Sequence, residues 1–237
     1  MHLKVTKKIY WVVCGPEGTE TKALLEAEWN SVEGTFRERA EVKTIKSLDK
    51  TSFIFDDPEH SVVMVMEAGS IKLNSDLIAL TSRLKAFAME GGTVLYGGLI
   101  APIISAKEFN SIFGEDGFNL GWEWLRYSGY ANKSYDAKVK GVLNCIAEVY
   151  ENNSLDLQFA KLPQEIDPFR PLVVAVQNSS HVLYRVEDHQ DSRGIKYNAA
   201  VVMAPVGKGF VGFCGDRDNA AQTRQIMAAM ASLPRKE

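Results

Sequence analysis

The chain has 237 residues, of which 46% are hydrophobic and 24% charged, and its formal net charge is −3. These values are typical of a globular protein with a sizeable core, and the small negative charge gives no reason to expect nucleic acid or an anionic membrane as partner. No apolar run approaches the roughly 20 residues that span a bilayer.

The first part of the chain alternates β-rich runs with a helical pattern. Residues 8–14 form an apolar run that predicts a strand, and a glycine-punctuated turn leads from it into a helix from about residue 21. Gly34 weakens that helix, so we expect it to end near Val32. Alternating charged and apolar residues at 41–46 indicate a strand near the edge of a sheet.

A strand, helix and strand then follow one another. Residues 62–66 and 94–96 are short, β-branched runs bounded by glycines, as in strands buried on both faces of a parallel sheet. Apolar residues lie between them at helical spacing: Leu77, Leu80, Leu84, Phe87 and Ala88. A right-handed crossover places both post-strand turns at one carboxyl edge, so we expect a site beside Gly69 and the pair Gly97 and Gly98.

An aromatic-rich insertion follows at about residues 105–135. Residues 105–113 predict a short helix, and residues 114–130 then contain four glycines and five aromatic side chains without periodicity. This loop predicts either a lid over a cleft, formed by residues 118–130, or an aromatic satellite core under a loop. An exposed cluster formed by Trp122, Trp124, Tyr127 and Tyr130 would instead predict a homo-oligomer interface.

The last part of the chain is rich in strand patterns. Residues 135–150 favour a strand with a bulge at Gly141, and residues 156–170 read as irregular with two prolines. Three short strands at 172–177, 182–186 and 198–204 suggest an antiparallel extension, before a last strand at 210–214 and a helix at 219–233. The fold class is therefore α/β, with a doubly wound, mostly parallel sheet, helices on both faces and an antiparallel extension.

In this order, the segments resemble the class I glutamine amidotransferase-like superfamily, which includes ThuA-like proteins and the amino-terminal domain of fungal biotin ligases. The resemblance rests on VVCGPEGTE, VMVMEAGS, AMEGGTVLYGG and a closing GKGFVGFCGD followed by a helix. The runs FGEDGFNLGWEW and VVMAPVGKGFVGFCGD also look like uncharacterised fungal members. The resemblance covers most of the chain and implies one flavodoxin-like domain over residues 1–237.

In catalytic members of that superfamily, a nucleophilic cysteine stands on a strained elbow, and a histidine and a glutamate follow the closing strand. At the elbow this chain reads YGGLI, without cysteine, serine or threonine, and after the closing strand it reads CGDRD, without histidine. A nucleophile needs an adjacent base, so the resemblance implies a pseudoenzyme that does not hydrolyse glutamine by the family mechanism.

The carboxyl edge keeps other reactive side chains. The candidate catalytic residues are Cys14, Glu67 and Asp216. Cys14 is either a thiol activated by the adjoining turn or a small buried residue, and Glu67 either projects into the cleft or is a solvated strand end. Asp216 is either a base or a helix cap. The candidate ligand-binding residues are Gly15, Glu17, Gly69, Ser70, Gly97, Gly98, Leu99, Trp122, Cys214 and Gly215.

Metals and cofactors are not expected. Cys14, Cys145 and Cys214 have no metal-ligand spacing and cannot all pair, which favours reduced thiols and a cytoplasmic protein. Cys14 and Cys214 would be neighbours if the first and last strands both lay near the middle of the sheet. His60 and His189 each lie among carboxylates, but solvated turns explain both patterns better than a metal site.

These observations favour a non-amidotransferase that binds a small polar molecule or a protein partner through the carboxyl edge and its lid. The alternative is a hydrolase, lyase or isomerase with Asp216 or Glu67 as acid/base and Cys14 as nucleophile. Whether the protein is an enzyme is left open by the sequence.

Overall fold

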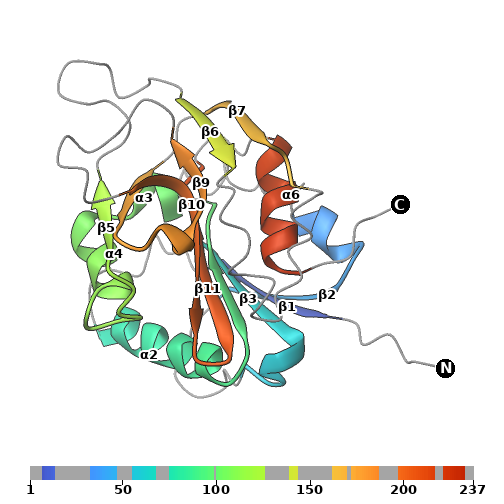
Figure 1. The fold of residues 1–237 in the computed structure, drawn as a ribbon. Helices are drawn as coiled ribbons and strands as arrows, with labels where there is room; N and C mark the ends of the chain where they lie inside the picture. Colours follow the sequence, from blue (N-terminus) through green and yellow to red (C-terminus); the bar gives the residue numbers. More distant parts are fainter. Residues whose placement is uncertain are drawn as a thin grey trace.

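The computed structural model describes residues 7–13, 33–46, 55–67, 75–98, 100–125, 139–143, 162–169, 172–186, 197–216 and 221–232. These segments build one eleven-stranded sheet with helices on both of its faces (Figure 1). The predicted mixed α/β architecture is confirmed.

One half of the sheet is parallel. Its strands lie in the order β2 (Glu41–Ile45), β1 (Lys8–Val13), β3 (Ser61–Glu67), β4 (Thr93–Tyr96) and β11 (Gly209–Cys214). All four neighbouring pairs are parallel. The first four strands, followed by the last, give the 2-1-3-4-5 order of flavodoxin-like sheets. Strand β2 is at the edge, as its alternating pattern predicts.

The other half is antiparallel, which confirms the predicted extension. Strand β10 (Tyr197–Val206) pairs with β11 and continues into β9 (Val182–Val186), β6 (Val139–Leu143) and the edge strand β7 (Glu165–Phe169). Strand β8 (Val173–Val176) also pairs with β10, and β5 (Trp122–Leu125) pairs with β8. The pairing of β6 with β7 shifts register between Val139 and Gly141, where the sequence predicts a bulge.

The sheet separates two hydrophobic cores. Helices α2 (Ser75–Met89) and α4 (Ala106–Phe113) cover one face, and α6 (Ala221–Met230) covers the other (Figure 1). Leu77, Leu80 and Leu84 bury the predicted stripe of α2 against the first face. Ile226, Met227 and Met230 do the same for α6 on the second face. The single turn α3 (Ile100–Ile103) is the next element along the chain after β4.

Helix α4 starts where its sequence predicts. The Ser105 hydroxyl accepts from the Glu108 backbone N–H, and the Glu108 carboxylate accepts from the Ser105 N–H at 2.8 Å. This reciprocal capping satisfies two backbone donors that a helix start otherwise leaves open, and a cap of this kind contributes about 1 kcal/mol. The cap thereby fixes the start of the helix, which packs on β5.

Three expectations were wrong. Residues 33–37 are helical, beyond the end expected near Val32, and no atom lies within 4 Å of a Cβ placed at Gly34. Residues 165–169, read as irregular, form β7, which tolerates Pro168 because it is an edge strand. Residues 122–125, read as loop, form β5, whose burial alternates from Trp122 to the exposed Glu123.

Candidate functional site

The carboxyl ends of the central strands bring the predicted elbow and the closing strand together. Tyr96 of β4 pairs with Val65 of β3 on one side and with Phe213 of β11 on the other. The residues that follow, Gly97 and Gly98 after β4 and Cys214 in β11, therefore lie side by side at this edge.

The elbow after β4 has a left-handed backbone at Gly98 but leaves no room for a nucleophilic side chain. Gly98 has φ +62°, and a Cβ there would lie 2.8 Å from the Met66 carbonyl oxygen. A Cβ on Gly97 would lie 2.9 Å from the Met227 Cε and 3.7 Å from the Cys214 Cβ. Both glycines are buried. Side chains from β3, β11 and α6 thus occupy the space that a reactive side chain would need.

Cys214 is buried beside this elbow. Burial raises the pKa of its thiol, and the nearby charge of Asp216 raises it further, to about 12. The thiol is therefore protonated at neutral pH, and a protonated thiol is a poor nucleophile. Cys214 packs in the core on the α6 face, as expected for a small apolar residue.

Asp216 is also buried, and its position is fixed by its neighbours. The Thr223 hydroxyl, in the first turn of α6, donates to a carboxylate oxygen of Asp216. The backbone before it is held on both sides, because the Gly215 N–H donates to Ala200 O at 2.9 Å and Leu172 N–H donates to Gly215 O at 2.7 Å. The carboxylate lies at the start of α6, where the helix dipole favours negative charge.

Tyr184 joins this cluster from the antiparallel half. It pairs with Val201, which pairs with Cys214 on its other side, so the three residues form one row across the sheet. The Tyr184 hydroxyl donates to Pro163 O at 2.7 Å. Burial raises the pKa of Tyr184, with a further contribution from Cys214. Neither Tyr184 nor Thr223 carries a sequence signal, because strand register brings Tyr184 here and the docking of α6 brings Thr223.

The remaining predicted residues of the edge can be placed only in part. Glu67 ends β3 and pairs with Val13 of β1, but its side chain lies outside the described residues. The other predicted residues outside the described part are Cys14, Gly15, Glu17, Gly69, Ser70 and Leu99. Strands β3 and β4 separate β1 from β11, which puts the ends of those two strands roughly 14 Å apart. The strand preceding Cys14 is therefore not a neighbour of the strand that contains Cys214.

Trp122 is a core residue. Its side chain is 1% exposed, and its ring packs on Phe113 of α4 at 5.2 Å between centroids. Phe118 is buried in the same cluster. The satellite-core interpretation therefore describes this part of the aromatic run, and Trp122 is not part of an exposed patch. Tyr127 and Tyr130 lie outside the described residues.

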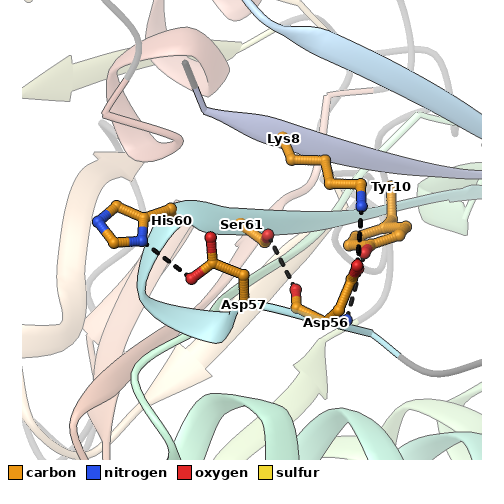
Figure 2. A network of polar contacts seen from close by, with 6 residues as sticks. All are labelled: Lys8, Tyr10, Asp56, Asp57, His60 and Ser61. Atoms are coloured by element: carbon orange, nitrogen blue, oxygen red, sulfur yellow. Dashed lines mark hydrogen bonds and ion pairs between the residues drawn. The ribbon is translucent and has the colours of Figure 1, made fainter. Parts of the chain in front are cut away.

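His60 belongs to a polar network at the opposite, amino edge of the sheet (Figure 2). Its Nδ1 lies 2.9 Å from Asp57 Oδ1, and the Ser61 hydroxyl donates to Asp56 O. The Lys8 Nζ donates to both carboxylate oxygens of Asp56, at 3.0 and 3.1 Å. The network ties the connector before β3 to β1. No group of three or more metal-ligating side chains occurs within the described residues, and His189 lies outside them.

Sequence comparisons with known proteins find no match. The chain matches no protein-family model and no curated protein sequence. Among the helices that the structure describes, none has the length and apolar composition needed to cross a membrane.

Solved structures share the fold at low sequence identity. A ThuA-like protein from Bacteroides uniformis superposes with a TM-score of 0.55 and 9% identity, over 97% of this chain and 92% of that one. A cytoplasmic protein from Salmonella typhimurium has a TM-score of 0.57 and 12% identity, over 95% of both chains. A β-galactosidase from Bacillus circulans has a TM-score of 0.50 and 12% identity; the match covers 95% of this chain and 30% of the enzyme. These likenesses support a ThuA-like fold.

Proposed function

We propose that this chain is a glutamine amidotransferase-like protein without the amidotransferase nucleophile, which binds a small polar ligand or a protein partner at the carboxyl edge of its sheet. The observation that carries the proposal is the closed elbow. Gly98 retains a left-handed backbone, while Met66, Met227 and Cys214 surround the two glycines.

The neighbouring groups support binding rather than nucleophilic catalysis. The thiol beside the elbow is protonated at neutral pH, because burial raises the pKa of Cys214 to about 12. The Asp216 carboxylate accepts a hydrogen bond from the Thr223 hydroxyl in the protein interior. Ligands of open α/β sheets bind outside the carboxyl ends of the strands, and β1, β3, β4 and β11 all end at this edge.

The proposal also covers the setting of the protein. The three cysteines without a pairing or metal-ligand pattern support a cytoplasmic protein, and a net charge of −3 supports one that binds neither nucleic acid nor an anionic membrane. The 2-1-3-4-5 order of the parallel strands supports a flavodoxin-like arrangement. A second copy of the chain is one candidate for the protein partner.

One observation favours a second candidate function. Asp216 is a buried carboxylate at the site edge, and burial is how enzymes prepare an acid or base for catalysis. The alternative is therefore a hydrolase, lyase or isomerase in which Asp216 or Glu67 exchanges protons and Cys14 attacks the substrate. Rapid alkylation of Cys14 below pH 7 would favour this enzyme, whereas a core cysteine stays unmodified until unfolding.

Two measurements test the leading proposal. Incubation with glutamine should release no more ammonia than a heat-denatured sample does. A panel of amino acids, carboxylates, sugars and nucleotides should contain a compound that raises the melting temperature of the wild type but not of Glu67→Gln. The exposed Glu115→Gln is the charge-matched control and should respond like the wild type. Ammonia release, or equal stabilisation of both variants, would contradict the proposal.

A further inference from the structure

The buried indole of Trp122 depends on one acceptor from a distant part of the chain. Its Nε1–H donates to the Nδ1 of His181 at 3.2 Å, and the two rings meet edge to face at 6.1 Å between centroids. Trp122 belongs to β5, whereas His181 ends the 3-10 turn η3 (Ser179–His181) before β9. An indole N–H can only donate, so Nδ1 must carry a lone pair and no proton.

The other ring nitrogen also faces a donor. Asn178 Nδ2 lies 3.3 Å from His181 Nε2. The orientation of this amide is set by Ser180, whose backbone N–H and hydroxyl both donate to Asn178 Oδ1, at 3.0 and 2.8 Å. An imidazolium has two N–H groups and no acceptor. In the neutral ring that accepts from Trp122, Nε2 already carries the one ring proton, so the Asn178 contact is the same in both protonation states. Of these two contacts, the one with Trp122 is therefore the one that opposes a protonated His181.

The neutral ring is also favoured by its surroundings. Burial lowers the pKa of His181, and no charged side chain contributes to the shift. Strand β10 packs on η3, and its one titratable side chain is the exposed Tyr197. The charged residues of the described neighbouring strands are Glu123 of β5 and Arg185 of β9, both exposed. Among the described residues, no carboxylate forms an ion pair with the ring that would stabilise its positive charge.

The indole is continuous with the site edge through packed aromatic rings. Trp122 contacts Phe113 at 5.2 Å, and Phe113 contacts Tyr96 at 5.1 Å between centroids. Tyr96 is the residue directly before the Gly97 and Gly98 elbow. A displacement of Trp122 would therefore remove packing from the side chain that supports this turn.

We propose that His181 and Trp122 form a proton-operated latch: protonation of His181 removes the acceptor of the buried indole N–H and loosens β5 from β8. Loss of that acceptor leaves a donor unsatisfied in a side chain that is 1% exposed. The latch is closed at neutral pH and opens in mild acid. It goes beyond the proposed ligand site and does not depend on it.

The indole Nε1–H resonance of Trp122 tests the latch directly. In ¹⁵N-labelled full-length protein, this signal is identified by its loss in Trp122→Phe. Between about pH 8 and pH 5 it should shift in one titration with a midpoint below 6.5, the ordinary value for histidine. His181→Gln keeps an acceptor that cannot be protonated, so its signal should stay constant. The exposed His60→Gln is the control and should titrate like the wild type.

Amide exchange gives the second readout. Protection of residues 123–125 against exchange, corrected for intrinsic rates, should fall about tenfold between neutral and mildly acidic pH in the wild type and should not fall in His181→Gln. If His181→Gln fails to fold, the ring Cε1–H of His181 must titrate with the same midpoint as the indole in the wild type. A constant indole signal, an unchanged titration in His181→Gln, or different midpoints would overturn the proposal.

Discussion

The Thr223 hydroxyl donates to the Asp216 carboxylate, and each of the two side chains is only 1% exposed. This contact joins the end of β11 to the first turn of α6. Removing the donor leaves a buried carboxylate with one fewer hydrogen bond, which costs about 1–3 kcal/mol. Thr223→Val should therefore lower the free energy of unfolding by about that amount in urea titrations. Thr223→Ser keeps the hydroxyl and should stay within about 1 kcal/mol of the wild type; equal losses in both variants would contradict the role of the hydroxyl.

Cys214 should make the protein sensitive to alkaline pH. Its pKa is raised from 9.0 to about 12 in the folded state, mainly by burial. Between these values the unfolded chain releases a proton that the folded chain keeps, so stability is fully present below pH 9 and is lost as pH rises toward 12. Urea titrations at increasing pH should show this decline.

Cys214→Ala separates the thiol from other alkaline titrations. This variant starts from a lower stability because it loses core packing, but its decline above pH 9 should be shallower than that of the wild type. Tyr184 and Tyr96 have raised pKa values as well and supply the part of the decline that remains. An identical slope in both proteins would show that Cys214 does not titrate as its burial requires.

The elbow glycine can be tested against a glycine with the same backbone. Gly98 has φ +62° and Gly121 has φ +64°, but a Cβ on Gly121 has only Gln177 Oε1 nearby, at 4.0 Å. Gly121→Ala therefore reports the left-handed backbone alone, which costs about 1–2 kcal/mol. Gly98→Ala adds a contact of 2.8 Å with the Met66 carbonyl oxygen and should lose distinctly more stability in the same urea titration. Equal losses would mean that the elbow is not closely packed.

The parts of the fold that depend on local pattern could be predicted from the sequence. The β-branched runs of β3 and β4, the leucine stripe of α2 and the Ser105 cap of α4 each have a signature within a few residues. Strand β7 was missed because Pro168 argues against a strand unless the strand is known to be at an edge.

The site could be predicted only as far as the edge on which it lies. A crossover between parallel strands places Gly97 and Gly98 at the carboxyl edge whatever the rest of the chain does. The partners of that edge depend on register and helix docking: Thr223 comes from α6, and Tyr184 reaches the Cys214 row through β9 and β10. Sequence spacing contains no information on such contacts.

Arg37 should protect the outer edge of β2. The Glu41 backbone N–H donates to Lys7 O, so Glu41 faces β1 and the next residue, Val42, faces outward. The Arg37 Nη1 donates to Val42 O at 3.1 Å, and its Nη2 donates to Thr44 Oγ1 at 2.9 Å. Unpaired outward carbonyls of an edge strand invite pairing with another chain, and a charged side chain over them prevents it.

Arg37→Ala should therefore aggregate faster than the wild type, although it loses little stability. The Arg37 side chain is half exposed, so its ion pair with the less exposed Glu33 contributes about 1 kcal/mol and the variant should remain folded. Light scattering at elevated temperature measures the aggregation rate, and the exposed Lys107→Ala is the control for loss of one positive charge. Arg37→Lys retains the charge but not the forked contacts, and should give an intermediate rate. Equal rates in Arg37→Ala and Lys107→Ala would show that net charge, and not cover of Val42 O, controls association at this edge.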